Sequence, residues 1–164
     1  MDILRSSRHA KVAGNFGETL VLYWLSKYGF ECASVDHTGI DLIARNPHTQ
    51  ELMGISVKSR TRSEGREQEY VSILRGDLVK AQVACDAFGC VAYFAIVIDA
   101  KDLIRVFITS KQHLLELFPL AATKSGWKMR ERYLTQYYED PEIKIFQLRA
   151  STPQWWQPTN SSRG

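Results

Sequence analysis

The first long pattern along the chain is an amphipathic stretch that predicts a helix over residues 12–28. Its apolar side chains recur at spacings of three and four, which places them on one face of a helix. Gly29 follows at once, and glycine commonly ends a helix. The predicted apolar face consists of Ala13, Phe16, Leu20, Val21, Trp24, Leu25 and Tyr28.

Three strand-like segments follow this helix. Residues 30–35 are short and mostly apolar, and residues 39–44 alternate between apolar side chains and others, as a half-buried strand does. Residues 46–49 read Asn-Pro-His-Thr, which is a turn signal, and a third alternating segment occupies residues 52–59. The turn would allow the second and third segments to pair as a hairpin.

The second half of the chain mixes helix and strand patterns. After a polar loop at residues 60–68, Asp77 is suited to cap a helix that Gly89 would end. Ser110 is suited to cap a short helix that would reach Phe118. Residues 119–141 show no clear periodicity. The strand patterns of this half lie at residues 90–98, 103–109 and 143–148.

These elements predict an α/β fold, a central mixed sheet flanked by helices with an α-β-β-β-α-β core. A chain of 164 residues suits one domain, which we place at residues 1–150. Residues 151–164 are expected to form a polar, mobile tail. The N-terminus lacks the apolar stretch of a signal peptide, and no apolar run approaches the ~20 residues of a membrane helix. We therefore expect a cytoplasmic protein without a membrane partner.

The cysteines and the net charge restrict the function only slightly. Cys32, Cys85 and Cys90 are odd in number and lack CxxC spacing, so they indicate core thiols rather than a disulfide framework or a zinc site. The formal net charge of +3 is too small to indicate nucleic-acid binding by itself. Basic residues do gather before the first helix, at residues 58–66 and at residues 124–132. Such clusters could neutralise phosphates or could be solvated surface.

Two charged side chains stand on strands that we expect to be neighbours. Asp41 and Lys58 each need a partner, hydration or a bound ion if they are partly buried. A hairpin would let both face one cleft, and Ser56 would share the face of Lys58 because it lies two residues earlier. Glu18, at the margin of the apolar helix face, could reach over the sheet edge. A purely structural Asp41–Lys58 ion pair is the competing interpretation.

Two carboxylates, a hydroxyl and an ammonium group in one cleft suit the hydrolysis of a phosphodiester. Carboxylate oxygens are the ligands that Mg²⁺ prefers. A bound Mg²⁺ ion acidifies a water molecule and offsets negative charge in the transition state. A lysine can stabilise the attacking hydroxide or a phosphate oxygen.

Three short motifs in this region resemble those of a known superfamily. They are GNFGE at residues 14–18, GIDLIA at residues 39–44 and ISVKS at residues 55–59. Their order and separation resemble the PD-(D/E)XK superfamily, whose members have the restriction-endonuclease-like fold. The chain is particularly similar to archaeal Holliday-junction resolvases, over about residues 12–60. The resemblance implies a nuclease that acts on DNA, and a homodimer.

The resemblance also implies a role for each residue of the candidate site. Asp41 would be the principal metal ligand, and Glu18 would bind the metal directly or through water. The backbone carbonyl of Val57 would complete the metal sphere. Lys58 would position the nucleophilic water. The expected cofactor is Mg²⁺, for which Mn²⁺ should substitute.

Ser56 departs from the pattern of the superfamily, which usually has a glutamate or aspartate at this position. The metal site then loses one formal negative charge. The site could work with more water ligands, or a carboxylate could have moved to another position. The chain could also be an inactive binding module. The candidates for a relocated carboxylate are Glu67, Glu69 and Asp77.

Further residues are candidates for contacts with nucleic acid. Arg60 and Arg62 follow Lys58 and are expected to point to alternate sides of the strand, so that one of them could bind a phosphate. Gln82, on the second long helix, is a third candidate. Aromatic residues interleave with basic ones near residues 127–138 and could stack on unpaired bases or pack in the core. These aromatic residues are Trp127, Tyr133, Tyr137 and Tyr138.

The leading hypothesis is therefore a Mg²⁺-dependent DNA endonuclease with an atypical Ser56. The alternative is a catalytically weak or inactive nucleic-acid-binding relative. A third is a protein-interaction or toxin-type module that uses Trp155 and Trp156 as an anchor. The sequence does not distinguish DNA from RNA, and it does not identify the shape of the substrate.

Overall fold

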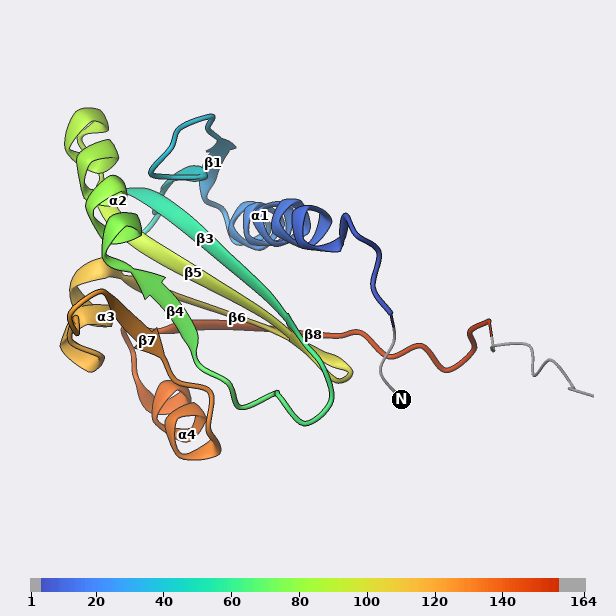
Figure 1. The fold of residues 1–164 in the computed structure, drawn as a ribbon. Coiled ribbons are helices and arrows are strands. Elements are labelled where there is room, and N and C mark those ends of the chain that lie inside the picture. Colours follow the sequence, from blue (N-terminus) through green and yellow to red (C-terminus); the bar gives the residue numbers. More distant parts are fainter. Residues whose placement is uncertain (1–3, 157–164) are drawn as a thin grey trace, which may run out of the picture.

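A six-stranded mixed sheet forms the centre of the protein, with helices on both of its sides (Figure 1). The structure is a computed structural model and describes residues 4–156. The helices are α1 (His9–Lys27), α2 (Arg75–Phe88), α3 (Lys111–Leu117) and α4 (Glu131–Glu139). The main sheet contains β1 (Glu31–Ser34), β2 (Leu42–Arg45), β3 (Leu52–Arg62), β5 (Val91–Ala100), β6 (Leu103–Ser110) and β8 (Lys144–Arg149). A separate antiparallel pair consists of β4 (Val71–Leu74) and β7 (Lys124–Trp127).

The strand order in the main sheet is β1-β2-β3-β5-β6-β8. All neighbours are antiparallel except β3 and β5, which are parallel because β4 and α2 lie between them in the chain. The predicted fold class, a mixed sheet flanked by helices, is confirmed. The predicted order of elements is confirmed as well, but β4, β7 and α4 were missed.

Some predicted boundaries were wrong. The loop expected at residues 60–68 begins only after Arg62, because β3 pairs with β5 as far as Arg62 opposite Ala100. Helix α2 begins at Arg75 with Leu74 as its N-cap, so Asp77 lies in the first turn and does not cap the helix. By contrast, Ser110 caps α3 as predicted, since its side chain accepts a hydrogen bond from the His113 N–H.

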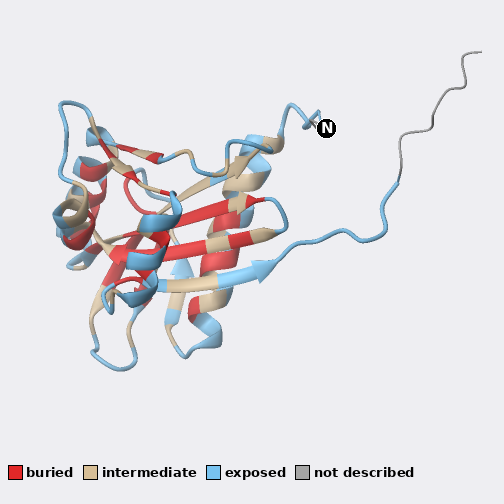
Figure 2. Cartoon of the chain, turned by 90° about the horizontal axis from the view of Figure 1, so that it is seen from below, coloured by how far each residue is buried: buried red, intermediate tan, exposed pale blue. Residues whose placement is uncertain are grey.

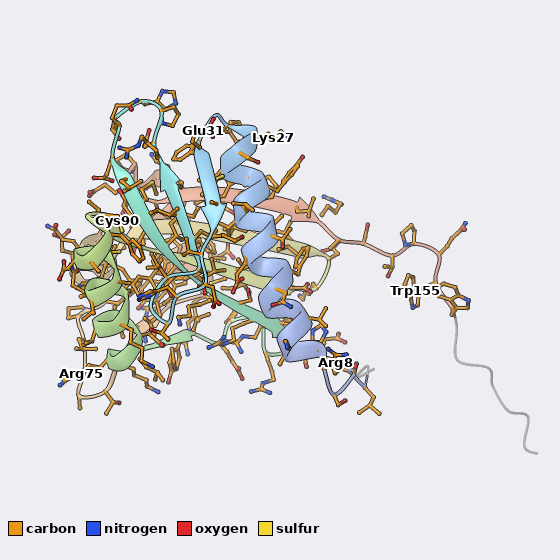
Figure 3. The ribbon with its side chains drawn as sticks, turned by 90° about the horizontal axis from the view of Figure 1, so that it is seen from above. Arg8, Lys27, Glu31, Arg75, Cys90 and Trp155 are labelled. Carbon is orange, nitrogen blue, oxygen red and sulfur yellow. The ribbon has the colours of Figure 1, made fainter. Side chains whose placement is uncertain are left out.

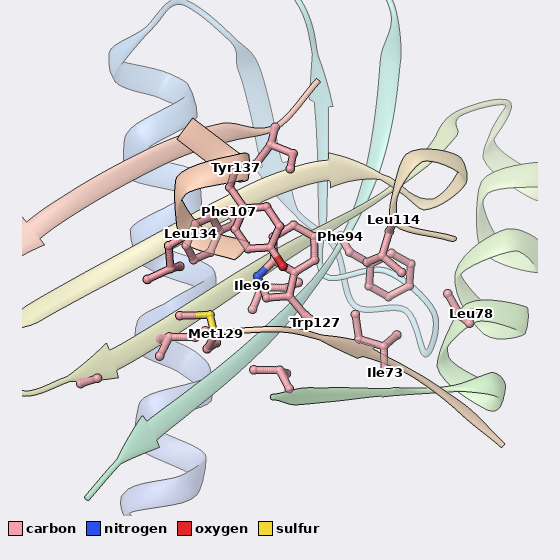
Figure 4. Close-up of a cluster of buried hydrophobic side chains, with 14 of the residues drawn as sticks. Ile73, Leu78, Phe94, Ile96, Phe107, Leu114, Trp127, Met129, Leu134 and Tyr137 are labelled. Carbon is pink, nitrogen blue, oxygen red and sulfur yellow. The ribbon is translucent and has the colours of Figure 1, made fainter. Parts of the chain in front are cut away.

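The sheet separates two main hydrophobic clusters, and Figure 2 shows the buried residues concentrated along its middle strands. Helix α1 covers one side with Leu20, Val21 and Leu25. The other side is covered by α3, α4 and the β4–β7 pair, whose aromatic side chains pack together as shown in Figure 4. Each side of the sheet therefore has its own core, and the strands in between are buried on both faces.

The aromatic residues near α4 divide between core and surface. Trp127 and Tyr137 are fully buried and stack with ring centroids 4.3 Å apart. The Tyr137 hydroxyl donates to the Lys128 carbonyl at 2.8 Å, which satisfies its buried polar group. For these two residues core packing is confirmed, so they are not available for stacking on bases. Tyr138 is exposed and Tyr133 is half-buried.

The remaining segments add little to the architecture. The cysteines carry free thiols. Within residues 4–156, no helix combines the length and the apolar content that a membrane span requires. Residues 151–156 are exposed, and Trp155 and Trp156 contact each other edge to face. The rest of the predicted tail, residues 157–164, lies outside the described part of the chain.

Gly39 marks the point where the segment before β2 touches α2. A Cβ atom at this residue would lie 2.1 Å from the Lys80 carbonyl oxygen and 3.0 Å from the Ala84 Cβ. The first of these contacts is with helix backbone, which cannot rotate away. The absence of a side chain therefore sets how closely α2 approaches the segment that carries Asp41.

We expect Gly39→Ala to lower the free energy of unfolding by about 1–3 kcal/mol, because α2 must move to make room. Urea denaturation would measure this loss. Gly14→Ala is the matched control, since no atom lies within 4 Å of its added Cβ and the residue is inside α1. That change should stabilise by roughly 0.5–1 kcal/mol. Equal effects of the two changes would contradict the packing argument.

Candidate active site

Asp41 is anchored where β2 and β3 stop pairing. Its N–H donates to the Ile55 carbonyl at 2.8 Å, and its carbonyl accepts from the Val35 N–H at 2.9 Å. Its carboxylate oxygen Oδ2 accepts from the Val57 N–H at 2.7 Å. The residue lies immediately before β2, not inside it as predicted. The side chain thus satisfies a backbone donor that the end of the strand would otherwise leave unpaired.

The strand register places three predicted residues on one face of the sheet. Leu42 lies opposite Ile55, so the preceding Asp41 comes opposite Ser56. Opposite residues in an antiparallel pair share a face, and Lys58 shares the face of Ser56 because it lies two residues further along β3. Ser56 is only 5% exposed. Asp41 and Lys58 are therefore on the same side of the sheet, which the predicted site requires.

Val57 presents its backbone toward the same edge as Asp41. In an extended strand the N–H and the carbonyl of one residue point to the same side. Because the Val57 N–H reaches the Asp41 carboxylate, the Val57 carbonyl also faces this side, beyond Ile55, the last residue of β3 that pairs with β2. Its side chain packs with the cluster under α1.

Glu18 enters the site from α1, and Gly17 brings the helix close enough for this. A Cβ atom at Gly17 would lie 1.9 Å from the Ser59 Oγ atom of β3. Burial raises the pKa of Glu18, and the charge of Asp41 and a hydrogen bond with it raise this pKa further. In the view of Figure 3, β2 and β3 run between α1 and α2. Two carboxyl groups thus meet at one edge of the sheet, where a cation would offset their repulsion.

Lys58 makes its ion pair with α2. Its Nζ atom lies 3.4 Å from Asp77 Oδ2, with the two side chains 20% and 29% exposed. The other candidates for a relocated carboxylate are held elsewhere. Glu67 accepts from the Gly65 N–H and pairs with Lys101, and Glu69 pairs with Arg66 and Arg62.

The prediction for the two arginines after Lys58 was wrong. Because β3 stays regular to its end, Arg60 and Arg62 lie on the same side as Lys58, not on alternate sides. Arg60 donates to the Ser59 carbonyl at 2.8 Å. Arg62 donates to the Tyr70 carbonyl at 3.1 Å and pairs with Glu69. The strand therefore carries a row of three cations along one face.

Gln82, the third predicted contact with nucleic acid, forms a bridge within the protein. Its amide nitrogen donates to Asp86 at 2.8 Å, and its amide oxygen accepts from Lys111 at 2.8 Å. The bridge joins α2 to the start of α3. A contact of Gln82 with a substrate stays a prediction.

A second charged cluster escaped the sequence analysis. The two ring nitrogens of His113 lie 2.7 Å from Asp140 and 3.3 Å from Glu142, and Glu116 is 3.4 Å away. Burial lowers the pKa of His113, but hydrogen bonds to Asp140 and Glu116 outweigh it and raise the pKa overall. Burial raises the pKa of Asp140, but the bond from His113 lowers it overall. No local spacing could have revealed the cluster, because only the fold brings α3 to the segment after α4.

Within residues 4–156, the trio His113, Asp140 and Glu142 is the one group of three His, Cys, Asp or Glu side chains close enough to hold a metal ion. None of its members belongs to the predicted site. The predicted site differs from this trio in kind, because it would combine two carboxylates with a backbone carbonyl.

Comparisons with known proteins agree with the predicted resemblance in fold. No protein-family model matches the chain, and no curated protein matches its sequence. Among solved structures, the chain is similar to Hjc, a Holliday junction resolvase from the archaeal hyperthermophile Archaeoglobus fulgidus. The TM-score is 0.52 and the sequence identity 16%, and the match covers 70% of this chain and 88% of that chain. The protein therefore has the restriction-endonuclease-like fold.

We expect His113→Gln to lower the melting temperature in a pH-dependent way. Because the pKa of His113 is raised in the folded protein, protonated His113 stabilises the fold. This stabilisation is complete below the pKa of the unfolded state and is lost as pH rises through the pKa of the folded state. Asp140 has a lowered pKa, so its ionised carboxylate stabilises the fold at higher pH. That stabilisation is lost only as pH falls through the pKa of Asp140 in the folded state. The loss of stability should be larger at pH about 6 than at pH about 9. Calorimetry at both values would measure it, and an equal loss would contradict the ion-pair assignment.

Proposed function

We propose that the chain is a metal-dependent nuclease that hydrolyses phosphodiester bonds in DNA. The observation that carries the proposal is the placement of Asp41 and Lys58 on one face of the sheet, with the Glu18 carboxyl group beside Asp41. The similar fold of Hjc, a Holliday junction resolvase, supports DNA as the substrate. A homodimer stays a prediction.

The oxygen atoms of the site fit Mg²⁺, which the proposal assigns to it. Glu18 and Asp41 supply hard anionic ligands, and the Val57 carbonyl supplies a neutral one. Burial and the nearby charge of Asp41 both raise the pKa of Glu18, and a divalent cation would relieve the repulsion between the two carboxylates. When bound, Mg²⁺ would lower the pKa of a water molecule and neutralise charge on the phosphate. Mn²⁺ should replace it because it accepts the same oxygen ligands.

The remaining side chains would orient the reactants. In this proposal the Lys58 ammonium group donates hydrogen bonds to the attacking water or to a phosphate oxygen, and so stabilises the negative charge that develops. Asp77 holds Lys58 from the first turn of α2. Ser56 contributes a hydroxyl group in place of the usual carboxylate.

Asp77 is the best candidate for the relocated carboxylate. It lies against Lys58, whereas Glu67 and Glu69 are engaged with other cations. A carboxylate at this place could restore the negative charge that Ser56 does not supply. It could instead act only by holding the lysine, and an experiment described below separates these roles.

Binding without cleavage is the second candidate function. The specific observation in its favour is the buried, neutral Ser56 at the position of a ligand. With fewer anionic ligands the site would bind metal more weakly, while the row of Lys58, Arg60 and Arg62 would still attract phosphates. This alternative predicts salt-dependent binding and no product.

Asp41→Asn should reduce the rate of DNA cleavage roughly 10²-fold or more, because it removes the charge of the principal metal ligand. Gel assays on duplex, single-stranded and four-way-junction DNA with Mg²⁺ or Mn²⁺ would measure this. Asp102→Asn, in the exposed turn between β5 and β6, is the control and should leave the rate unchanged. Background cleavage that is equal in wild type and Asp41→Asn would remove the catalytic proposal.

The role of Asp77 can be tested by returning a carboxylate to residue 56. Asp77→Asn should lower both cleavage and Mn²⁺ affinity. If Asp77 replaces the missing ligand charge, adding Ser56→Asp to Asp77→Asn should restore Mn²⁺ affinity, measured by calorimetric titration, to within roughly tenfold of wild type. Loss of cleavage with unchanged Mn²⁺ affinity in Asp77→Asn would instead assign it to holding Lys58.

A further inference from the structure

A hollow of about 540 Å³ lies where the segment after β3 faces the segment that joins β7 to α4. Four cations line it, namely Arg66, Lys128, Arg130 and Arg132. Among its described lining residues Glu69 is the one acidic side chain, and it is already paired with Arg66 and Arg62. We call this site the Tyr70 hollow, after the tyrosine in its wall. Its lining therefore carries an excess of positive charge.

Tyrosine rings hold two of these cations, Lys128 and Arg132, and the neighbouring Lys124. Tyr70 is 42% exposed, and the Nζ atoms of Lys124 and Lys128 lie 5.1 Å and 4.9 Å from its ring centroid. Lys124 also donates to the Tyr70 hydroxyl at 2.8 Å. The guanidinium group of Arg132 lies 4.7 Å from the ring centroid of Tyr133. A cation on an aromatic ring keeps its charge, unlike one neutralised by a carboxylate, and so it can still attract an anion.

The hollow continues the row of cations that begins at the candidate active site. Lys58, Arg60 and Arg62 share one face of β3, and Arg62 donates to the Tyr70 carbonyl at 3.1 Å. Arg62 lies four residues beyond Lys58, which is roughly 13 Å along an extended strand. The row of cations therefore leads from the candidate active site to the wall of the hollow.

We propose that the Tyr70 hollow binds the phosphate backbone of DNA to one side of the bond that the candidate active site would cut. The placement of the hollow relative to a cut bond rests on the proposed nuclease function, whereas the binding of DNA by the hollow does not. Guanidinium groups suit this task because their paired N–H donors match two phosphate oxygens. The hollow would fix the direction in which the strand leaves the cleft, and it would do so regardless of sequence.

The test compares two triple variants that remove the same net charge. Lys128→Ala, Arg130→Ala and Arg132→Ala together empty the hollow of three cations. Lys27→Ala, Arg45→Ala and Lys144→Ala together remove three exposed cations from α1, β2 and β8. Affinity for a long duplex is measured by fluorescence anisotropy in EDTA, so that no cleavage occurs.

The hollow variant should lose roughly 10²-fold in affinity at about 0.1 M salt, and its salt slope should fall by about 2–3. The control variant should lose less than about threefold, with a nearly unchanged slope. Equal losses in the two variants would overturn the proposal, because general charge would then explain the binding. Equally strong competition by a polyglutamate peptide would also overturn it, since the hollow would then be a general anion site.

A separate measurement fixes the distance along the strand. One neutral methylphosphonate is placed in turn at successive positions from the cut, and KM and kcat are compared. KM should rise severalfold only over a few neighbouring positions on one side of the cut, with kcat unchanged. A uniform effect at every position would refute a localised contact with the hollow. If no cleavage occurs at all, the nuclease proposal fails, whereas the anisotropy result in EDTA still decides whether the hollow binds DNA.

Discussion

The site depends on one hydrogen bond, from the Val57 N–H to the Asp41 carboxylate at 2.7 Å. This bond lies where β2 ends, so a side chain continues a ladder that the backbone can no longer extend. It fixes the carboxylate beside β3 and leaves the Val57 carbonyl directed to the same edge. Glu18 from α1 lies beside this carboxylate, and Lys58 of β3 lies on the same side of the sheet as Asp41.

Much of this arrangement could be predicted from local patterns. The period of two in β2 and β3 placed Asp41, Ser56 and Lys58 on one face, because a strand alternates its side chains whatever surrounds it. The periodic helix α1 and its end near Gly29 were visible for the same reason. The exact start of β2 could not be predicted, because Asp41 is held by a hydrogen bond from the Val57 N–H to its side chain, and strand propensity does not encode such a bond.

Long-range packing accounts for the misses. The segment with β7 and α4 shows no regular apolar pattern in the sequence, so its aromatic residues could have been either core or surface residues. The structure shows Trp127 and Tyr137 stacked in the core. The cluster around His113 joins residues 27 positions apart. Asp77 was expected to cap a helix, and its pairing with Lys58 depends on how α2 lies across β3.

Two glycines let the helices approach the strands of the candidate site closely. Gly17 lets α1 approach β3, and Gly39 lets α2 approach the segment before β2. Neither contact involves the side chains of Glu18, Asp41 or Lys58. The approach of the two helices is thus set by other residues than the charged groups, so a charged group can be exchanged without a change in how the helices pack. A scaffold of this kind can therefore gain or lose ionisable groups through single substitutions while its helices keep their places.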